Sequence, residues 1–300
     1  MLGGASGRQW RAIVPAIAIL VTISVSLQAQ RTVVRSVFVN ATDSAGRPVL
    51  DLTPADFQVT ESGAKREITH ATLGSAPMRI VLMVDSSTSV GPMINMFKKA
   101  LAAFVDTLPP QHEVAFISSG SQIRIRARPN DIRDKLRAEI ARFSSEGGAN
   151  AFLDTLLEAD TRFLKSAPGQ WPAFVIVTTD NGDNSKEPDV VAYNKFMNDF
   201  VARGGAAHAV IVMGKRTGPV TDLVTNLVEN VQGFHLTLNT DNSLPERMKD
   251  IAERLDIDHR VMMNRYQITY AGNPAIAAPV VNVSVSRDDV RLQMSARRPF

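Results

Sequence analysis

The stretch that decides the fold is residues 78–89, MRIVLMVDSSTS. Residues 79–84 form a nearly unbroken apolar run of strand length, which is typical of a strand buried on both faces of a sheet. Asp85, Ser87 and Ser89 follow at alternate positions, and a helical pattern begins after them at Pro92. The stretch therefore predicts a buried parallel strand that presents one carboxylate and two hydroxyls at its carboxyl end.

These three side chains outline a site for a hard cation. Mg²⁺ prefers oxygen ligands and usually takes only one or two carboxylates from a protein, with hydroxyls and waters completing its shell. Open α/β sheets bind ligands in the crevice outside the carboxyl ends of their strands, where this loop is expected. Asp and Ser are also common turn and helix-cap residues, so for this loop alone both interpretations stay open.

The N-terminus has the pattern of an export signal. Arg8 and Arg11 precede residues 12–30, which carry no charge and end in small residues near Ala29. We interpret residues 1–30 as a signal peptide, which predicts a periplasmic or extracellular protein. The alternative is a membrane anchor formed by residues 12–30, since that run is just long enough to span a bilayer.

Composition describes an ordinary globular chain of 300 residues, 44% of them hydrophobic and 21% charged. Without Arg8 and Arg11, the 33 Lys and Arg fall to 31 against 30 Asp and Glu. Because the remaining chain is nearly neutral, we expect no nucleic-acid partner. The absence of cysteine excludes disulfides and thiol metal sites.

Residues 77–264 alternate between strand and helix patterns, which predicts a parallel sheet. Strands are expected at residues 79–84, 113–118, 174–177, 207–212 and 234–238, with a hairpin partner for the second at residues 122–128. Helices are expected from Pro92, at residues 131–143, 151–164, 188–203 and 219–231, and from a capping box at Ser243 and Glu246 toward residue 263.

Residues 31–76 and 265–300 instead show the period of two that is typical of strands. Neither segment has enough strands to bury a face alone. We therefore expect the two segments to pack together as one small β-sandwich into which the α/β domain is inserted. The ends of a domain often lie close together, which makes such an insertion feasible.

Two further loops carry polar side chains at the ends of expected strands. Residues 146–154, EGGANAFLD, place Asn150 in a glycine-rich loop before a helix. Residues 179–183, TDNGD, place Asp180 directly after the strand at 174–177.

Together the three loops resemble the von Willebrand factor A domain and its metal-ion-dependent adhesion site. The family pattern is Asp-x-Ser-x-Ser after the first strand, a Thr in a later Gly-rich loop, and an Asp after the fourth strand. Asp85, Ser87 and Ser89 match the first element and Asp180 matches the last, whereas Asn150 stands where the Thr is expected. More narrowly, the chain looks like the exported bacterial VWFA-related family, through residues 37–49, 52–57, 266–270 and 295–300.

The resemblance implies a doubly wound, Rossmann-like, mostly parallel sheet with one antiparallel edge strand and a divalent cation at its top. By this resemblance we expect the cation to be Mg²⁺, with Mn²⁺ or Ca²⁺ as alternatives, and its ligands to be Asp85, Ser87, Ser89, Asn150 and Asp180. An open coordination position would accept an Asp or Glu carboxylate from a protein partner. Because Asn150 lacks the family's hydroxyl, the alternative is an interaction domain with a vestigial metal site.

Enzyme chemistry finds little support in the sequence. The five histidines include no i, i+4 pair, and no Gly-x-Ser-x-Gly or phosphate-binding glycine loop with lysine is present. A nucleophilic aspartate beside Mg²⁺ would need a second aspartate at position 87, where Ser87 stands. We therefore expect a protein that is not an enzyme.

Overall fold

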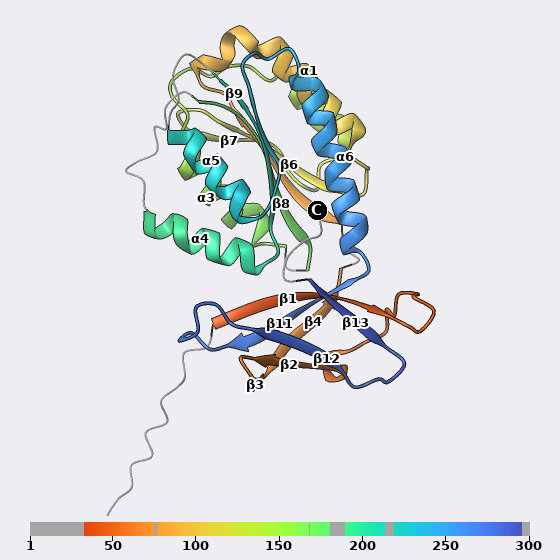
Figure 1. The fold of residues 1–300 in the computed structure, drawn as a ribbon. Helices are drawn as coiled ribbons and strands as arrows, with labels where there is room; N and C mark the ends of the chain where they lie inside the picture. The colour runs from red at the N-terminus through yellow and green to blue at the C-terminus, as the bar shows by residue number, and fades with distance from the viewer. Residues whose placement is uncertain (1–32, 75–76, 168, 181–189, 214–218, 296–300) are drawn as a thin grey trace, which may run out of the picture. The chain divides into compact units, whose positions relative to one another are not determined.

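The computed structural model describes residues 33–74, 77–167, 169–180, 190–213 and 219–295, all within the compact unit 32–300 (Figure 1). The expected signal peptide, residues 1–30, lies outside the described residues. Within them, none of the helices combines the length and the apolar character that crossing a bilayer requires.

The central sheet has six strands in the order β10-β9-β8-β5-β6-β7. Its strands are β5 (Met78–Asp85), β6 (Glu113–Ser119), β7 (Ile123–Ala127), β8 (Trp171–Thr179), β9 (Ala206–Val212) and β10 (His235–Leu238). Every neighbouring pair is parallel except β6 and β7, which pair antiparallel at the edge. The prediction of a mostly parallel sheet with one antiparallel edge strand is confirmed.

Helices cover both faces of this sheet (Figure 1). One face packs against α1 (Ile94–Thr107), α2 (Arg133–Ala141) and α6 (Leu244–Met262), and the other against α3 (Phe152–Ala159), α4 (Val190–Ala202) and α5 (Pro219–Asn230). Alternate residues of β5 enter the two cores, Leu82 on the first face and Met83 on the second. This two-sided burial explains why β5 is apolar at every position from Ile80 to Val84.

Several element ends differ from the sequence predictions. The chain forms a 3-10 turn at Thr88–Met93, so α1 begins at Ile94 and not at Pro92. The helix expected at residues 151–164 divides into α3 and a π-helical turn, Asp160–Leu164. The predicted capping box is wrong, because Ser243 is itself in the helical conformation and its side chain caps nothing.

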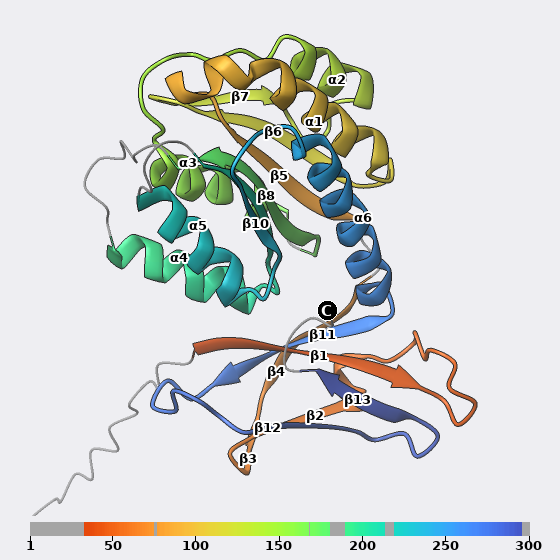
Figure 2. The ribbon, with the colours of Figure 1, turned by 45° about the horizontal axis from the view of Figure 1, so that its top comes forward.

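Strands from both ends of the chain form two further sheets (Figure 2). The first has the strand order β13-β1-β11-β4, with β13 (Arg291–Ser295), β1 (Val33–Thr42), β11 (Arg265–Gly272) and β4 (Ile68–Leu73). The second has the order β12-β2-β3, with β12 (Val281–Val285), β2 (Phe57–Glu61) and β3 (Ala64–Arg66). β1 pairs antiparallel with β11, from Val33 opposite Gly272 to Asn40 opposite Arg265. Each of the two sheets thus joins the N-terminal and C-terminal segments.

The two sheets share a third apolar core. Its largest members are Phe57 from β2 and Tyr266, Ile268 and Tyr270 from β11, all at most 4% exposed. Since this core draws on both terminal segments, neither segment alone supplies it. The domain boundaries 31–76, 77–264 and 265–300 remain our proposal on this basis.

Two buried histidines pack against each other where β5 begins. The rings of His112 and His259 lie edge to face with centroids 4.5 Å apart. The Met78 N–H donates a 3.2 Å hydrogen bond to Nδ1 of His112, which is therefore neutral at this nitrogen. Burial, followed by the charge of His259 and opposed by that of Asp256, lowers the pKa of His112 to about 4.

This lowered pKa predicts a loss of stability in acid. A histidine in the unfolded chain titrates near 6.5, so below that pH the unfolded state binds a proton that the folded state resists. The contribution of His112 is complete above pH 6.5 and is lost as the pH falls toward 4. Between about pH 7.5 and about pH 5 we expect a decrease of about 2 kcal/mol in the free energy of unfolding, measured by urea denaturation.

The matched variant is His112→Asn, whose side-chain oxygen can still accept the Met78 N–H. It should flatten this part of the pH profile, whereas His70→Asn, at an exposed position, should leave the profile unchanged. An unchanged slope in His112→Asn would show that other groups cause the acid sensitivity.

Candidate metal centre

Asp85 is the last residue of β5 and is 1% exposed. Its Oδ1 accepts a 2.7 Å hydrogen bond from the Ser87 N–H, and its Oδ2 accepts hydrogen bonds from the Thr179 N–H at 3.1 Å and the Thr179 hydroxyl at 2.5 Å. Burial raises the pKa of Asp85, although these hydrogen bonds act in the opposite direction. The carboxylate is therefore fixed in place but poorly compensated in charge.

The Ser87 hydroxyl lies beside this carboxylate and is also buried, with the residue 1% exposed. No described residue is placed to form a well-oriented hydrogen bond with the Ser87 Oγ. The hydroxyl nevertheless lies near enough to Asp85 to favour the charged form of that carboxyl group and so to act against the rise in its pKa. Ser89, two positions on, is partly exposed. A buried hydroxyl oxygen without a good hydrogen-bond partner, next to a carboxylate, suits a cation ligand.

Asn150 lies at the same edge of the sheet and is fully buried. Its Oδ1 accepts a 2.7 Å hydrogen bond from the Ser119 hydroxyl, and its Nδ2 donates a 3.1 Å hydrogen bond to the Thr178 hydroxyl. Because Ser119 ends β6 and Thr178 lies near the end of β8, Asn150 ties together strands that flank β5. This position therefore has a structural role whether or not its amide oxygen reaches a cation.

Asp180 follows the last residue of β8 and is fully buried. Its neighbour Thr179 makes both hydrogen bonds to Asp85 described above, so the two aspartates lie at the same edge of the sheet. Residues 181–189, which continue this loop, lie outside the described residues.

The glycine-rich loop packs directly on the Asp85 loop. Gly147 and Gly148 have positive φ angles of 79° and 70°, which residues with a side chain rarely adopt. This turn lets the Gly148 carbonyl accept hydrogen bonds from the Thr88 N–H at 3.0 Å and from its hydroxyl at 3.2 Å. Glu146 forms ion pairs with Arg124 and Arg126, which fix the start of the loop.

Sequence reasoning missed the hydroxyls that support the site. Thr179 orients Asp85, while Ser119 and Thr178 orient Asn150. The sequence held one indication of this supporting role, namely that these hydroxyl residues stand at the carboxyl ends of two buried strands. That signal is weak, because Ser and Thr also end strands as ordinary turn residues.

The donor set fits a hard cation better than a zinc-type site. In the described part of the chain, no group of three or more His, Cys, Asp and Glu side chains is placed to hold a metal. The ligands predicted from the sequence are instead two carboxylates with hydroxyl and amide oxygens, which are the groups that Mg²⁺ and Ca²⁺ prefer.

Comparison with known proteins identifies the fold. The family model of the von Willebrand factor type A domain matches residues 80–233. The chain belongs to this family. No curated protein matches the chain.

Three solved structures are similar to this chain at low sequence identity. The von Willebrand factor type A protein from Catenulispora acidiphila is 12% identical with a TM-score of 0.53, over 90% of this chain and 74% of that one. BatB from Bacteroides thetaiotaomicron is 12% identical with a TM-score of 0.45, over 60% and 99%. Proximal thread matrix protein 1 from mussel byssus, with a zinc-occupied MIDAS motif, is 14% identical with a TM-score of 0.46, over 71% and 50%.

Proposed function

We propose that this von Willebrand factor A protein is an exported binding module that recognises a protein partner through a divalent cation. Domains of the family generally serve as interaction modules. The proposed ligands are Asp85, Ser87, Ser89 and Asp180, and Asn150 is a fifth, through its amide oxygen. Mg²⁺ is the expected ion, and Mn²⁺ or Ca²⁺ would use the same oxygens.

The observation that carries the proposal is the buried pair of Asp85 and Ser87. Both residues are 1% exposed, the pKa of Asp85 is raised by burial, and the Ser87 Oγ meets no described residue in hydrogen-bond geometry. Burying a charge and a hydroxyl without full compensation costs free energy. A cation at this point would offset both costs.

The residues of the chain would divide the work of binding. Thr179 fixes the Asp85 carboxylate, and the hydroxyls of Ser87 and Ser89 would offer oxygen ligands without adding charge. Two carboxylates would balance the charge of a divalent ion, and a coordination position that the protein leaves open would accept a third. When bound, the ion would supply that position to an Asp or Glu side chain of the partner.

An interaction domain that works without metal is the second candidate. The observation in its favour is Asn150, whose amide oxygen and nitrogen are both engaged, by Ser119 and Thr178. This candidate predicts partner binding that chelators leave unchanged.

Replacing Asp85 by alanine should abolish stabilisation by Mg²⁺. For the unsubstituted protein we expect a free energy of unfolding higher by about 2.7 kcal/mol when Mg²⁺ is present at about 100 times its Kd, because the ion binds only the folded state. The measurements are thermal unfolding with and without Mg²⁺ or EDTA, and calorimetric titration with Mg²⁺, Mn²⁺ and Ca²⁺.

The control is Asp288→Ala, an exposed aspartate in the turn before β13, which should keep the full response. Absence of both heat and stabilisation with all three ions in the unsubstituted protein would refute the metal site and favour the second candidate.

A further inference from the structure

Over half the length of β1, one of its two edges is paired with no described strand. The strand pairs with β11 from Val33 to Asn40, but with β13 only from Phe38 to Thr42. On the side of β13, no described strand therefore pairs with residues 33–37.

The direction of the backbone groups along this edge follows from the neighbouring strands. The Ala271 N–H donates to the Glu67 carbonyl, and the Arg265 carbonyl accepts from the Gly74 N–H, so the odd-numbered residues of β11 face β4. The even-numbered residues of β11 consequently face β1, where their partners are the odd-numbered residues. The N–H and C=O groups of Val34 and Ser36 therefore point away from β11, toward the free side.

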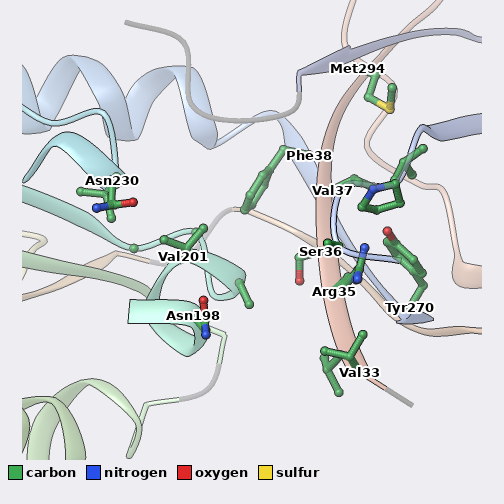
Figure 3. Close-up of a pocket in the computed structure, with 18 residues that line it drawn as sticks. Val33, Arg35, Ser36, Val37, Phe38, Asn198, Val201, Asn230, Tyr270 and Met294 are labelled. Carbon is green, nitrogen blue, oxygen red and sulfur yellow. The ribbon is translucent and has the colours of Figure 1, made fainter. Parts of the chain in front are cut away.

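A groove of about 610 Å³ runs along this edge (Figure 3). Val201 and Asn198 of α4 lie on one side of β1, and Tyr270 lies on the other. Met294 of β13 also lines the groove, near the point where β13 stops. The groove thus occupies the place that an extension of β13 would take.

Its lining is largely apolar and carries almost no charge. Val34 and Met294 are 61% and 42% exposed, which is unusual for large apolar side chains gathered at one groove. Among the described residues that line it, Arg35 is the single charged one, and its guanidinium lies 3.1 Å from Glu61. A neighbouring hollow that shares Val34 and Ser36 is lined by Lys195, Asp199 and Arg203, so the low charge belongs to this groove and not to the whole edge.

We propose that this groove binds an extended, uncharged and largely apolar peptide segment of a partner protein, which adds to the sheet beside β1 and antiparallel to it. The N–H and C=O groups of Val34 and Ser36, which no described strand pairs, complement a peptide backbone, and β13 already shows that an antiparallel strand fits this side. Alternate side chains of the peptide would face α4 and Tyr270. The surface is separate from the candidate metal centre, so this binding should not respond to EDTA.

Amide hydrogen exchange of the protein alone is the first test. The amides of Val34 and Ser36 should exchange fast, and those of Arg35 and Val37, which face β11, should exchange slowly. If Val34 and Ser36 are protected at every protein concentration, the proposal is overturned and the chain's own residues 296–300 are the better candidate for the segment that pairs with β1. If protection grows with protein concentration, the proposal is overturned and a second copy of the chain is the better candidate.

The second test uses a displayed library of random octapeptides selected on the unsubstituted protein. Val34→Pro removes one free N–H at a strand edge, where proline is tolerated, while Val34→Thr keeps both that N–H and the branched shape. Selected peptides should bind Val34→Thr normally and Val34→Pro at least about tenfold more weakly. Equal binding to both variants, no enriched peptide, or loss of binding in EDTA would each overturn the proposal.

Discussion

Replacing Glu61 by alanine is expected to destabilise the protein by about 4 kcal/mol. Glu61 is fully buried in β2, and its carboxylate lies 3.1 Å from Nη1 of Arg35 and 2.8 Å from Nε of Arg66. It also accepts a 2.8 Å hydrogen bond from the Asn273 N–H. Without the carboxylate, two largely buried guanidinium groups lose their counter-charge and the amide loses its acceptor, although Arg35 keeps its hydrogen bonds to backbone carbonyls. Uncompensated buried charge is among the costliest defects in a protein.

Urea denaturation of three variants separates charge from shape. Glu61→Gln keeps an acceptor for Asn273 but not the charge, so we expect its loss of stability to fall between those of Glu61→Ala and the unsubstituted protein. Glu253→Ala removes an exposed ion pair with Lys249 and should cost at most about 1 kcal/mol. If Glu61→Ala cost no more than Glu253→Ala, the buried ion-pair cluster would contribute nothing to the sandwich.

The ion-pair cluster of Glu61, Arg35 and Arg66 shows which part of the contact between the terminal segments could be predicted. Their association could be predicted from the sequence, whereas the buried ion pairs could not. The alternation of apolar residues was sufficient to predict strands that need each other to bury a face. In the sequence, however, Glu61 reads as part of a Glu-Ser-Gly turn that closes a strand. The turn is real, with positive φ at Ser62 and Gly63, but no local pattern indicates that Glu61 turns inward toward Arg35.

In the α/β domain, the sequence predicted the elements better than their ends. The apolar run before Asp85 identified β5 because a strand buried on both faces must be apolar throughout. The ends depend on tertiary contacts that no single segment contains. The 3-10 turn before Ile94, for example, follows hydrogen bonds from Thr88 to the Gly148 carbonyl, in a loop some 60 residues away.

The candidate site was accessible to sequence reasoning only in part. The loops of Asp85, Asn150 and Asp180 do converge at the carboxyl edge of parallel strands, as their positions after strands predicted. The hydrogen bonds of Asn150 to Ser119 and Thr178 could not be foreseen, because they join residues far apart in the chain. Through these hydrogen bonds Asn150, which stands where the family pattern has Thr, links β6 to β8.

Replacing Gly233 by alanine is expected to destabilise the protein by at least about 3 kcal/mol. A Cβ at Gly233 would lie 1.8 Å from the carbonyl oxygen of Ala207, far inside van der Waals contact with the backbone of β9. The clash cannot be relieved by turning a side chain, so the strand β10 that follows must move away from β9. That movement would break the 2.9 Å hydrogen bond from the Ala209 N–H to the Phe234 carbonyl.

Gly91→Ala is the matched control, because its added Cβ would meet only Ser145 atoms, at 3.9 Å and beyond. We expect it to change the free energy of unfolding in urea by no more than about 0.5 kcal/mol. If Gly233→Ala does not fold, the comparison is the soluble yield of the two variants, where only Gly233→Ala should be lost. A Gly233→Ala protein as stable as Gly91→Ala would mean that β10 is not held against β9 at this point, and that the close approach of the two backbones is not required by the fold.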